Sequence, residues 1–77
     1  MYKLLDTVAL THDMPDAGLQ RGDLGAIVEL LAPDAMEVEF VAASGRTQAL
    51  LTLHAEDIRH VGDRDVIAVR TLEGAAG

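Results

Sequence analysis

Apolar side chains recur at every second position in several short segments, and this period of two constrains the fold more than any other feature. Over residues 36–40, Met36, Val38 and Phe40 alternate with two glutamates, which places the three apolar side chains on one face of a strand. Four further segments are short and rich in aliphatic or β-branched residues: 6–10, 26–31, 46–53 and 65–70. About five strands in 77 residues predict an all-β meander.

Turn-forming residues separate these segments. Pro33 suits the second position of a tight turn over 32–35, and Gly45, which accepts positive φ without steric cost, closes the next hairpin. Residues 54–58 are too few for an α-helix, so a single 3₁₀ or helical turn is expected there. A helix over 42–58 is the alternative, and Gly45 together with the threonines of that stretch disfavours it.

Composition limits how such a sheet can be stabilised and what it can bind. A chain of 77 residues buries a modest core, and the absence of cysteine removes disulfides and thiolate metal sites. Self-association or a very regular fold would then supply the remaining stability. The formal net charge is −7, from 13 acidic and 6 basic residues, so basic proteins are the better electrostatic partners.

The segment over residues 21–28 contains two glycines around an aspartate. Gly22, Asp23 and Gly25 predict a sharp bend that leads directly into a strand, because the Asp23 carboxylate can accept bonds from nearby backbone amides. The second strand of KOW-type modules starts in a similar way. A single turn before the last strand, as expected here, also fits a small SH3-like barrel of about five strands.

A wider resemblance rests on the following segments: 4–10, 18–28, 37–40, 50–53 and 58–59. Over residues 4–61 the chain resembles a bacterial family, domain of unknown function 4926. The resemblance implies a small SH3-like barrel with no established activity, so it assigns no functional residue. We therefore expect a barrel core over 1–61 and an extension over 62–77, which adds a C-terminal strand and ends in a frayed tail at 73–77.

Two popular uses of small β-barrels are disfavoured. Binding of nucleic acid needs a basic track and exposed aromatic rings, whereas this acidic chain has only Tyr2 and Phe40, and the core requires Phe40. A groove for proline-rich peptides also needs an aromatic lining. No apolar run reaches the roughly 20 residues that span a bilayer. The first residues do not form a signal-peptide pattern, so a cytoplasmic location is expected.

Catalytic, cofactor and metal sites are not expected. The spacing of His12, His54 and His60 matches no metal signature, and exposed histidines are the simpler interpretation. Ser44 lies in a turn, with neither a base nor an oxyanion pocket in prospect. The chain is therefore expected not to be an enzyme.

Protein binding is the function that remains. Glu37 and Glu39 lie on the solvent face of their strand, and Asp34 lies in the preceding turn, so these three carboxylates could dock a basic partner. The hypothesis is a small acidic adaptor, regulatory or antitoxin-like module. The alternative is a structural module that self-associates as a homodimer, through an exchanged C-terminal strand.

Overall fold

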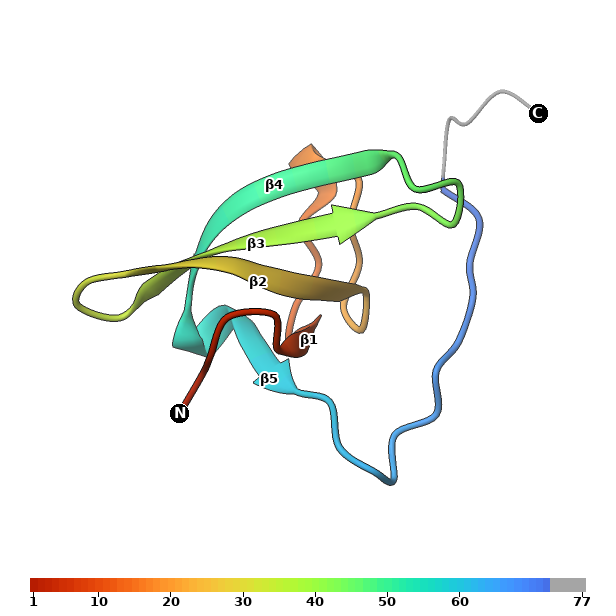
Figure 1. Ribbon diagram of the computed structural model, residues 1–77. Helices are drawn as coiled ribbons and strands as arrows, with labels where there is room; N and C mark the ends of the chain where they lie inside the picture. Colours follow the sequence, from red (N-terminus) through yellow and green to blue (C-terminus); the bar gives the residue numbers. More distant parts are fainter. Residues whose placement is uncertain (73–77) are drawn as a thin grey trace.

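The protein is a single antiparallel β-sheet with two 3₁₀ turns, as a computed structural model shows (Figure 1). The structure describes residues 1–72. Its strands and turns, in chain order, are β1 (Thr7–Leu10), η1 (Pro15–Ala17), β2 (Leu24–Leu31), β3 (Ala35–Val41), β4 (Thr47–His54), η2 (Ala55–Asp57) and β5 (Ile58–His60). The strand order in the sheet is β4-β3-β2-β1-β5, so β4 and β5 are its edges.

The inner face of the sheet forms the core. Met36, Val38 and Phe40 are each at most 4% exposed, as the alternation of β3 predicts. Neighbouring strands add apolar side chains at positions paired with these, such as Ile27 opposite Val38. The buried cluster consists of Val8, Leu10, Leu19, Ile27, Met36, Val38, Phe40, Leu53 and Ile58. Burial of each large aliphatic or aromatic side chain contributes about 1.5–3 kcal/mol, so this cluster is the main source of stability.

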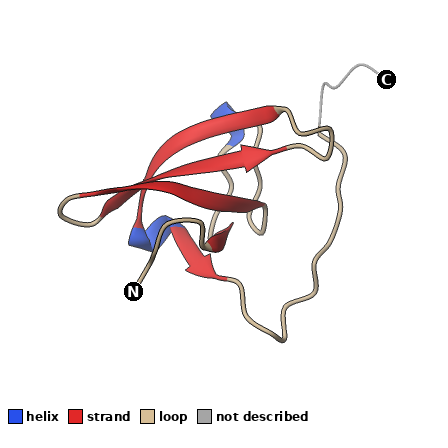
Figure 2. Ribbon diagram, in the orientation of Figure 1, coloured by secondary structure: helices blue, strands red, loops and turns tan. Residues whose placement is uncertain are grey.

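The loop between β1 and β2 closes one end of this core. It contains η1, and an isolated antiparallel β-bridge pairs Met14 with Leu19 on either side of this turn. Leu19 is 3% exposed and Met14 packs against the same cluster. Figure 2 shows that both 3₁₀ turns lie in connections outside the strands. The loop is therefore part of the packed structure.

Three glycines occupy positions that a side chain would disturb, for two different reasons. Gly22 and Gly45 have φ of 92°, the left-handed region that glycine enters most easily. Gly25 lies within β2, where a Cβ atom would come within 2.7 Å of Val38 Cγ1 and 2.9 Å of Phe40 Cε2. Gly22 and Gly45 thus make the bends, whereas Gly25 allows β2 to approach the core residues of β3.

The sheet differs from the expected closed barrel. Its edge strands, β4 and β5, are not hydrogen-bonded neighbours, so the sheet remains open. All-β architecture and five strands are confirmed. The fifth strand, however, is Ile58–His60, directly after η2.

The expected strand over 65–70 is wrong, because no strand is assigned after His60 within residues 1–72. A turn at Gly62 and Asp65 redirects the chain: Asp65 N donates to Gly62 O at 3.1 Å, and Gly62 N donates to Asp65 Oδ2 at 2.6 Å. Both sides of β1 are already occupied by β2 and β5. The C-terminal segment, residues 61–72, instead runs in a wide arc back toward the β3–β4 hairpin (Figure 1). The frayed tail expected at 73–77 lies outside the described residues.

Candidate functional site

The outer face of β2, β3 and β4 gathers three glutamates. Glu29 pairs with Glu37 across β2 and β3, and Glu39 lies two positions further along β3. Directly paired residues, and residues two apart on one strand, share a face, so all three carboxylates lie on the side opposite the core. No lysine or arginine occurs in these three strands. We call this surface the acidic face, defined by Glu29, Glu37, Glu39 and the two β4 residues paired with the β3 glutamates, Leu50 and Thr52.

Two hydroxyl groups hold the carboxylates of β3 in place. Thr52 Oγ1 donates to Glu37 Oε1, and Thr47 Oγ1 donates to Glu39 Oε2 at 2.6 Å. Both glutamates are half-buried, whereas Glu29 is exposed. Leu50, opposite Glu39, is 56% exposed, so an apolar side chain borders the charged one. The face therefore combines fixed hydrogen-bond acceptors with accessible apolar surface.

Asp34, the third predicted partner-binding residue, does not belong to this face. It lies exposed in the turn between β2 and β3, which contains the cis peptide bond Ala32–Pro33. Glu37 and Glu39 lie together on β3, as the period of two predicts.

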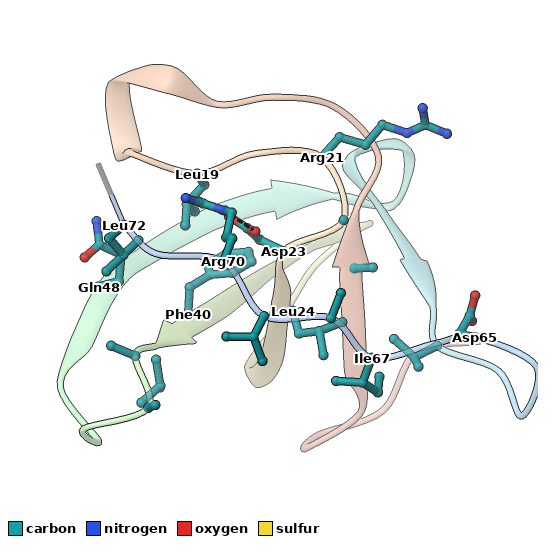
Figure 3. A pocket seen from close by; sticks show the side chains of 18 of the residues that line it. Leu19, Arg21, Asp23, Leu24, Phe40, Gln48, Asp65, Ile67, Arg70 and Leu72 are labelled. Carbon is teal, nitrogen blue, oxygen red and sulfur yellow. Dashed lines mark hydrogen bonds and ion pairs between the residues drawn. The ribbon is translucent and has the colours of Figure 1, made fainter. Parts of the chain in front are cut away.

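A second surface lies between the sheet and the C-terminal segment. Here a cavity of about 730 Å³ is bordered by Ala9, Leu24 and Phe40 of the sheet and by Ile67 and Arg70 of the segment (Figure 3). We call it the C-terminal groove. Most of the side chains drawn around it in Figure 3 are apolar, and its lining residues also form two ion pairs, Arg59–Asp65 and Arg70–Asp23.

The second of these ion pairs joins Arg70 to Asp23, the residue just before β2. Arg70 Nε donates to Asp23 Oδ1 at 2.9 Å, Arg70 Nη2 donates to Asp23 Oδ2, and Arg70 Nη2 also donates to Gly18 O at 3.1 Å. Gln20 N donates to Asp23 Oδ2 at 2.8 Å. The Arg70 guanidinium, helped by the Gln20 amide, holds the pKa of the Asp23 carboxyl below its usual range, although partial burial opposes this. Asp23 is therefore both the predicted turn residue and the acceptor of a charged pair.

His12 and Asp57 form a further polar contact, on the loop side of the sheet. His12 Nε2 lies 2.8 Å from Asp57 Oδ1, and Thr11 N donates to Asp57 O at 2.9 Å. The hydrogen bond to Asp57, together with a bond to Asp13 O, raises the pKa of His12 above its usual range. The His54 amide and the His12 ring lower the pKa of Asp57. The contact ties the end of β1 to η2.

We expect the titration midpoint of His12 in the folded chain to lie above about 6.5, its ordinary value. Because the folded pKa is raised, the contribution of His12 to stability is complete below the unfolded pKa and is lost as pH rises through the folded pKa. NMR titration of the imidazole protons measures the midpoint. Asp57→Asn should return it toward the ordinary value. A midpoint at or below 6.5 in the unmodified chain, or one that Asp57→Asn leaves unchanged, would contradict the contact.

The other candidate residues in the described part of the chain, the histidines and Ser44, lie at the surface. All three histidines are exposed, and Ser44 Oγ accepts a bond from Arg46 N at 3.3 Å in its turn. Residues 1–72 contain no cluster of three or more histidine, cysteine, aspartate or glutamate side chains that could hold a metal ion. None of the helical turns in the described part of the chain is long and apolar enough to cross a membrane.

Comparison with known proteins places this sheet in a family. The model of a domain of unknown function, DUF4926, matches residues 4–60, which include all five strands. The chain belongs to the DUF4926 family. No curated protein and no solved structure matches it. In this DUF4926 chain the C-terminal segment lies beyond the matched residues, whereas Asp23 and the acidic face lie within them.

Sequence reasoning missed two functional candidates. Glu29 lies in an otherwise apolar run of β2. A register shift between Ile27 and Glu29 interrupts the alternation of inner and outer positions, so the pattern does not show which face Glu29 is on. As the single charged residue of β2, it could have been recognised as solvent-facing. Arg70 is 47 residues from Asp23, and no local pattern signals that contact.

Proposed function

We propose that this DUF4926 chain is a non-enzymatic module that binds a basic protein through its acidic face. The observation that carries the proposal is the direct pairing of Glu29 with Glu37 on strands that contain no lysine or arginine. Like charges opposite one another destabilise a sheet, and the strands provide no cation to offset the repulsion. Cationic side chains of a partner would offset the repulsion between Glu29 and Glu37 and would form ion pairs with them.

The geometry of the face favours docking over catalysis. Hydrogen bonds from Thr47 and Thr52 fix the carboxylates of Glu39 and Glu37 on an open sheet surface. General acid–base chemistry requires a site that positions a substrate, usually in a concave pocket, and none of the three glutamates lines the C-terminal groove. The net charge of −7 adds long-range attraction for a basic partner.

An SH3-like relationship is part of the same proposal. The strand order β4-β3-β2-β1-β5 and the 3₁₀ turn between β4 and β5 support it. Small folds of this kind usually bind their ligands on exposed surfaces and loops, which agrees with a binding role.

The double variant Glu37→Lys/Glu39→Lys tests the proposal. A tagged chain is used to capture proteins from the lysate of its native host at low and moderate salt, with identification by mass spectrometry. We expect the unmodified chain to enrich one basic protein, which is lost as salt rises and is absent with the variant. With that protein purified, association should be about tenfold slower for the variant and less dependent on salt.

The matched control is Asp16→Lys/Glu56→Lys, which changes the net charge equally at two exposed carboxylates of η1 and η2. If the control abolished capture as completely as the β3 variant, attraction would depend on net charge alone and the acidic face would not be the site. Undiminished capture by the β3 variant would exclude this face directly.

Self-association is the second candidate, and a specific observation favours it. Val66, Ile67 and Val69 are 90%, 60% and 98% exposed, and the edge strands β4 and β5 are open. A second copy could cover these side chains or pair with an edge. If the same capture recovered only the chain itself, this candidate would replace the first.

A further inference from the structure

The C-terminal groove contains a receptor for a guanidinium group. Its components are the Asp23 carboxylate and the Gly18 carbonyl, which together accept three hydrogen bonds from Arg70. We call this pair of acceptors the guanidinium site. The two-point contact between an arginine and a carboxylate is geometrically specific, because both groups are planar and their donors and acceptors match.

The two acceptors of the guanidinium site, Gly18 O and the Asp23 carboxylate, both belong to the connection between η1 and β2, outside the C-terminal segment. Gln20 N donates to Asp23 Oδ2, and Asp23 N donates to Gln20 O at 3.0 Å, so the turn orients the carboxylate by itself. The Asp23 side chain is 17% exposed. A partly buried, oriented carboxylate of this kind favours a cationic ligand.

The segment that occupies this site is held mainly by its ends. Asp65 is bound by Arg59, with Arg59 Nη1 to Asp65 Oδ2 at 3.0 Å, and Arg70 is bound by Asp23. Between these anchors, Val66 and Val69 are almost fully exposed, and the segment joins no strand of the sheet. Burial of its apolar side chains therefore contributes little, and partly exposed ion pairs contribute little each. A ligand with a better apolar fit could displace the segment.

We propose that the C-terminal groove is a docking site for an extended, apolar segment of another protein that ends in arginine. Residues 65–70 form one wall of the groove, and their Arg70 competes weakly for the guanidinium site in cis. The partner's arginine would take the guanidinium site, and its apolar side chains would fill the cavity beside Leu24 and Phe40. We infer a cationic residue at the end of the partner's segment because the Asp23 carboxylate is negatively charged. This surface is separate from the acidic face and does not rest on the function proposed for it.

The test uses the full chain and a labelled peptide, Val-Ile-Ala-Val-Arg, whose sequence is that of residues 66–70. Removal of the competitor by Arg70→Gln should tighten peptide binding about two- to fivefold relative to the unmodified chain, the range expected for one partly exposed ion pair. The variant Arg70→Gln/Asp23→Asn should bind at least tenfold more weakly than Arg70→Gln, because the charged acceptor is lost. The peptide Val-Ile-Ala-Val-Gln should bind the Arg70→Gln variant as weakly as the arginine peptide binds the double variant.

Two-dimensional NMR spectra of each variant, recorded before titration, verify the fold and locate the peptide through shifts at Ala9, Gly18 and Leu24. Because Asp23→Asn also changes a turn, the glutamine-ended peptide keeps the test decisive if that variant does not fold. Equal binding of the arginine and glutamine peptides, or equal affinity of the unmodified chain and Arg70→Gln, would overturn the proposal. So would a dimer in sedimentation velocity that Asp23→Asn dissociates, since the occupant would then be a second copy.

Discussion

Replacement of Phe40 by alanine is expected to lower the free energy of unfolding by about 3–5 kcal/mol. Phe40 is 2% exposed and is among the largest fully buried side chains of the described structure. Its ring packs in the main cluster and close to the backbone of Gly25. The substitution removes the ring and leaves a cavity that the flanking strands cannot fully close. Equilibrium unfolding in urea, followed by circular dichroism, measures the change.

A domain of this length is typically stable by about 4–12 kcal/mol, so the Phe40 variant should lose much of its cooperativity or be largely unfolded. Val41→Ala is the matched control on the same strand, since Val41 is 49% exposed. We expect it to change stability by less than about 1 kcal/mol. Equal losses for the two variants would show that Phe40 does not anchor the core.

Alanine at Gly25 is expected to destabilise the fold by about 1–3 kcal/mol, although it adds a single methyl group. The new Cβ would lie 2.7 Å from Val38 Cγ1 and 2.9 Å from Phe40 Cε2, closer than packed atoms approach. Val38 is β-branched and Phe40 is enclosed, so neither can move aside without disturbing its neighbours. The same urea titration measures the loss, and an upfield or downfield change in core methyl signals would show the displacement.

Gly62→Ala provides the control for this prediction. A Cβ at that position would meet its nearest atom, Asp65 Oδ2, at 3.7 Å, which is an ordinary contact. We expect a change within about 0.5 kcal/mol. If Gly25→Ala were as well tolerated as Gly62→Ala, β2 and β3 would have room to separate, and the close approach of these strands would not be a structural requirement.

Gly25 also shows where local sequence reasoning gives an incomplete explanation. The pattern of Gly22, Asp23 and Gly25 correctly indicates a bend that leads into a strand, and Gly22 has the positive φ that such a bend needs. For Gly25, however, the requirement comes from Val38 and Phe40, thirteen and fifteen positions along the chain. A glycine chosen for backbone conformation and one chosen for close packing look alike in a sequence.

The candidate sites divide in the same way. Glu37 and Glu39 were located by alternation, since a strand with one buried face must expose the other. Their pairing with Glu29 depends on the β2–β3 register, which a shift at Ile27 alters. Asp34 is a local inference from a turn, and in the structure it lies exposed in that turn.

The expected strand over 65–70 is the most informative difference. Its residues have high β-propensity, but propensity describes how side chains suit a pleated surface and does not provide a neighbouring strand. β5 takes the free side of β1, and the turn at Gly62 and Asp65 directs the chain elsewhere. The ion pairs at Arg59 and Arg70 then hold the segment across the sheet.

The sequence by itself determined the all-β class, the positions of β1 to β4 and the face of β3 that forms the core, because period-two patterning and turn residues act over a few neighbouring positions. Only the tertiary structure decided that the sheet stays open, that Glu29 faces Glu37, and that Arg70 meets Asp23 47 residues away. These features depend on which edges remain free and which charges meet once the strands have packed. Such non-local contacts leave no local pattern.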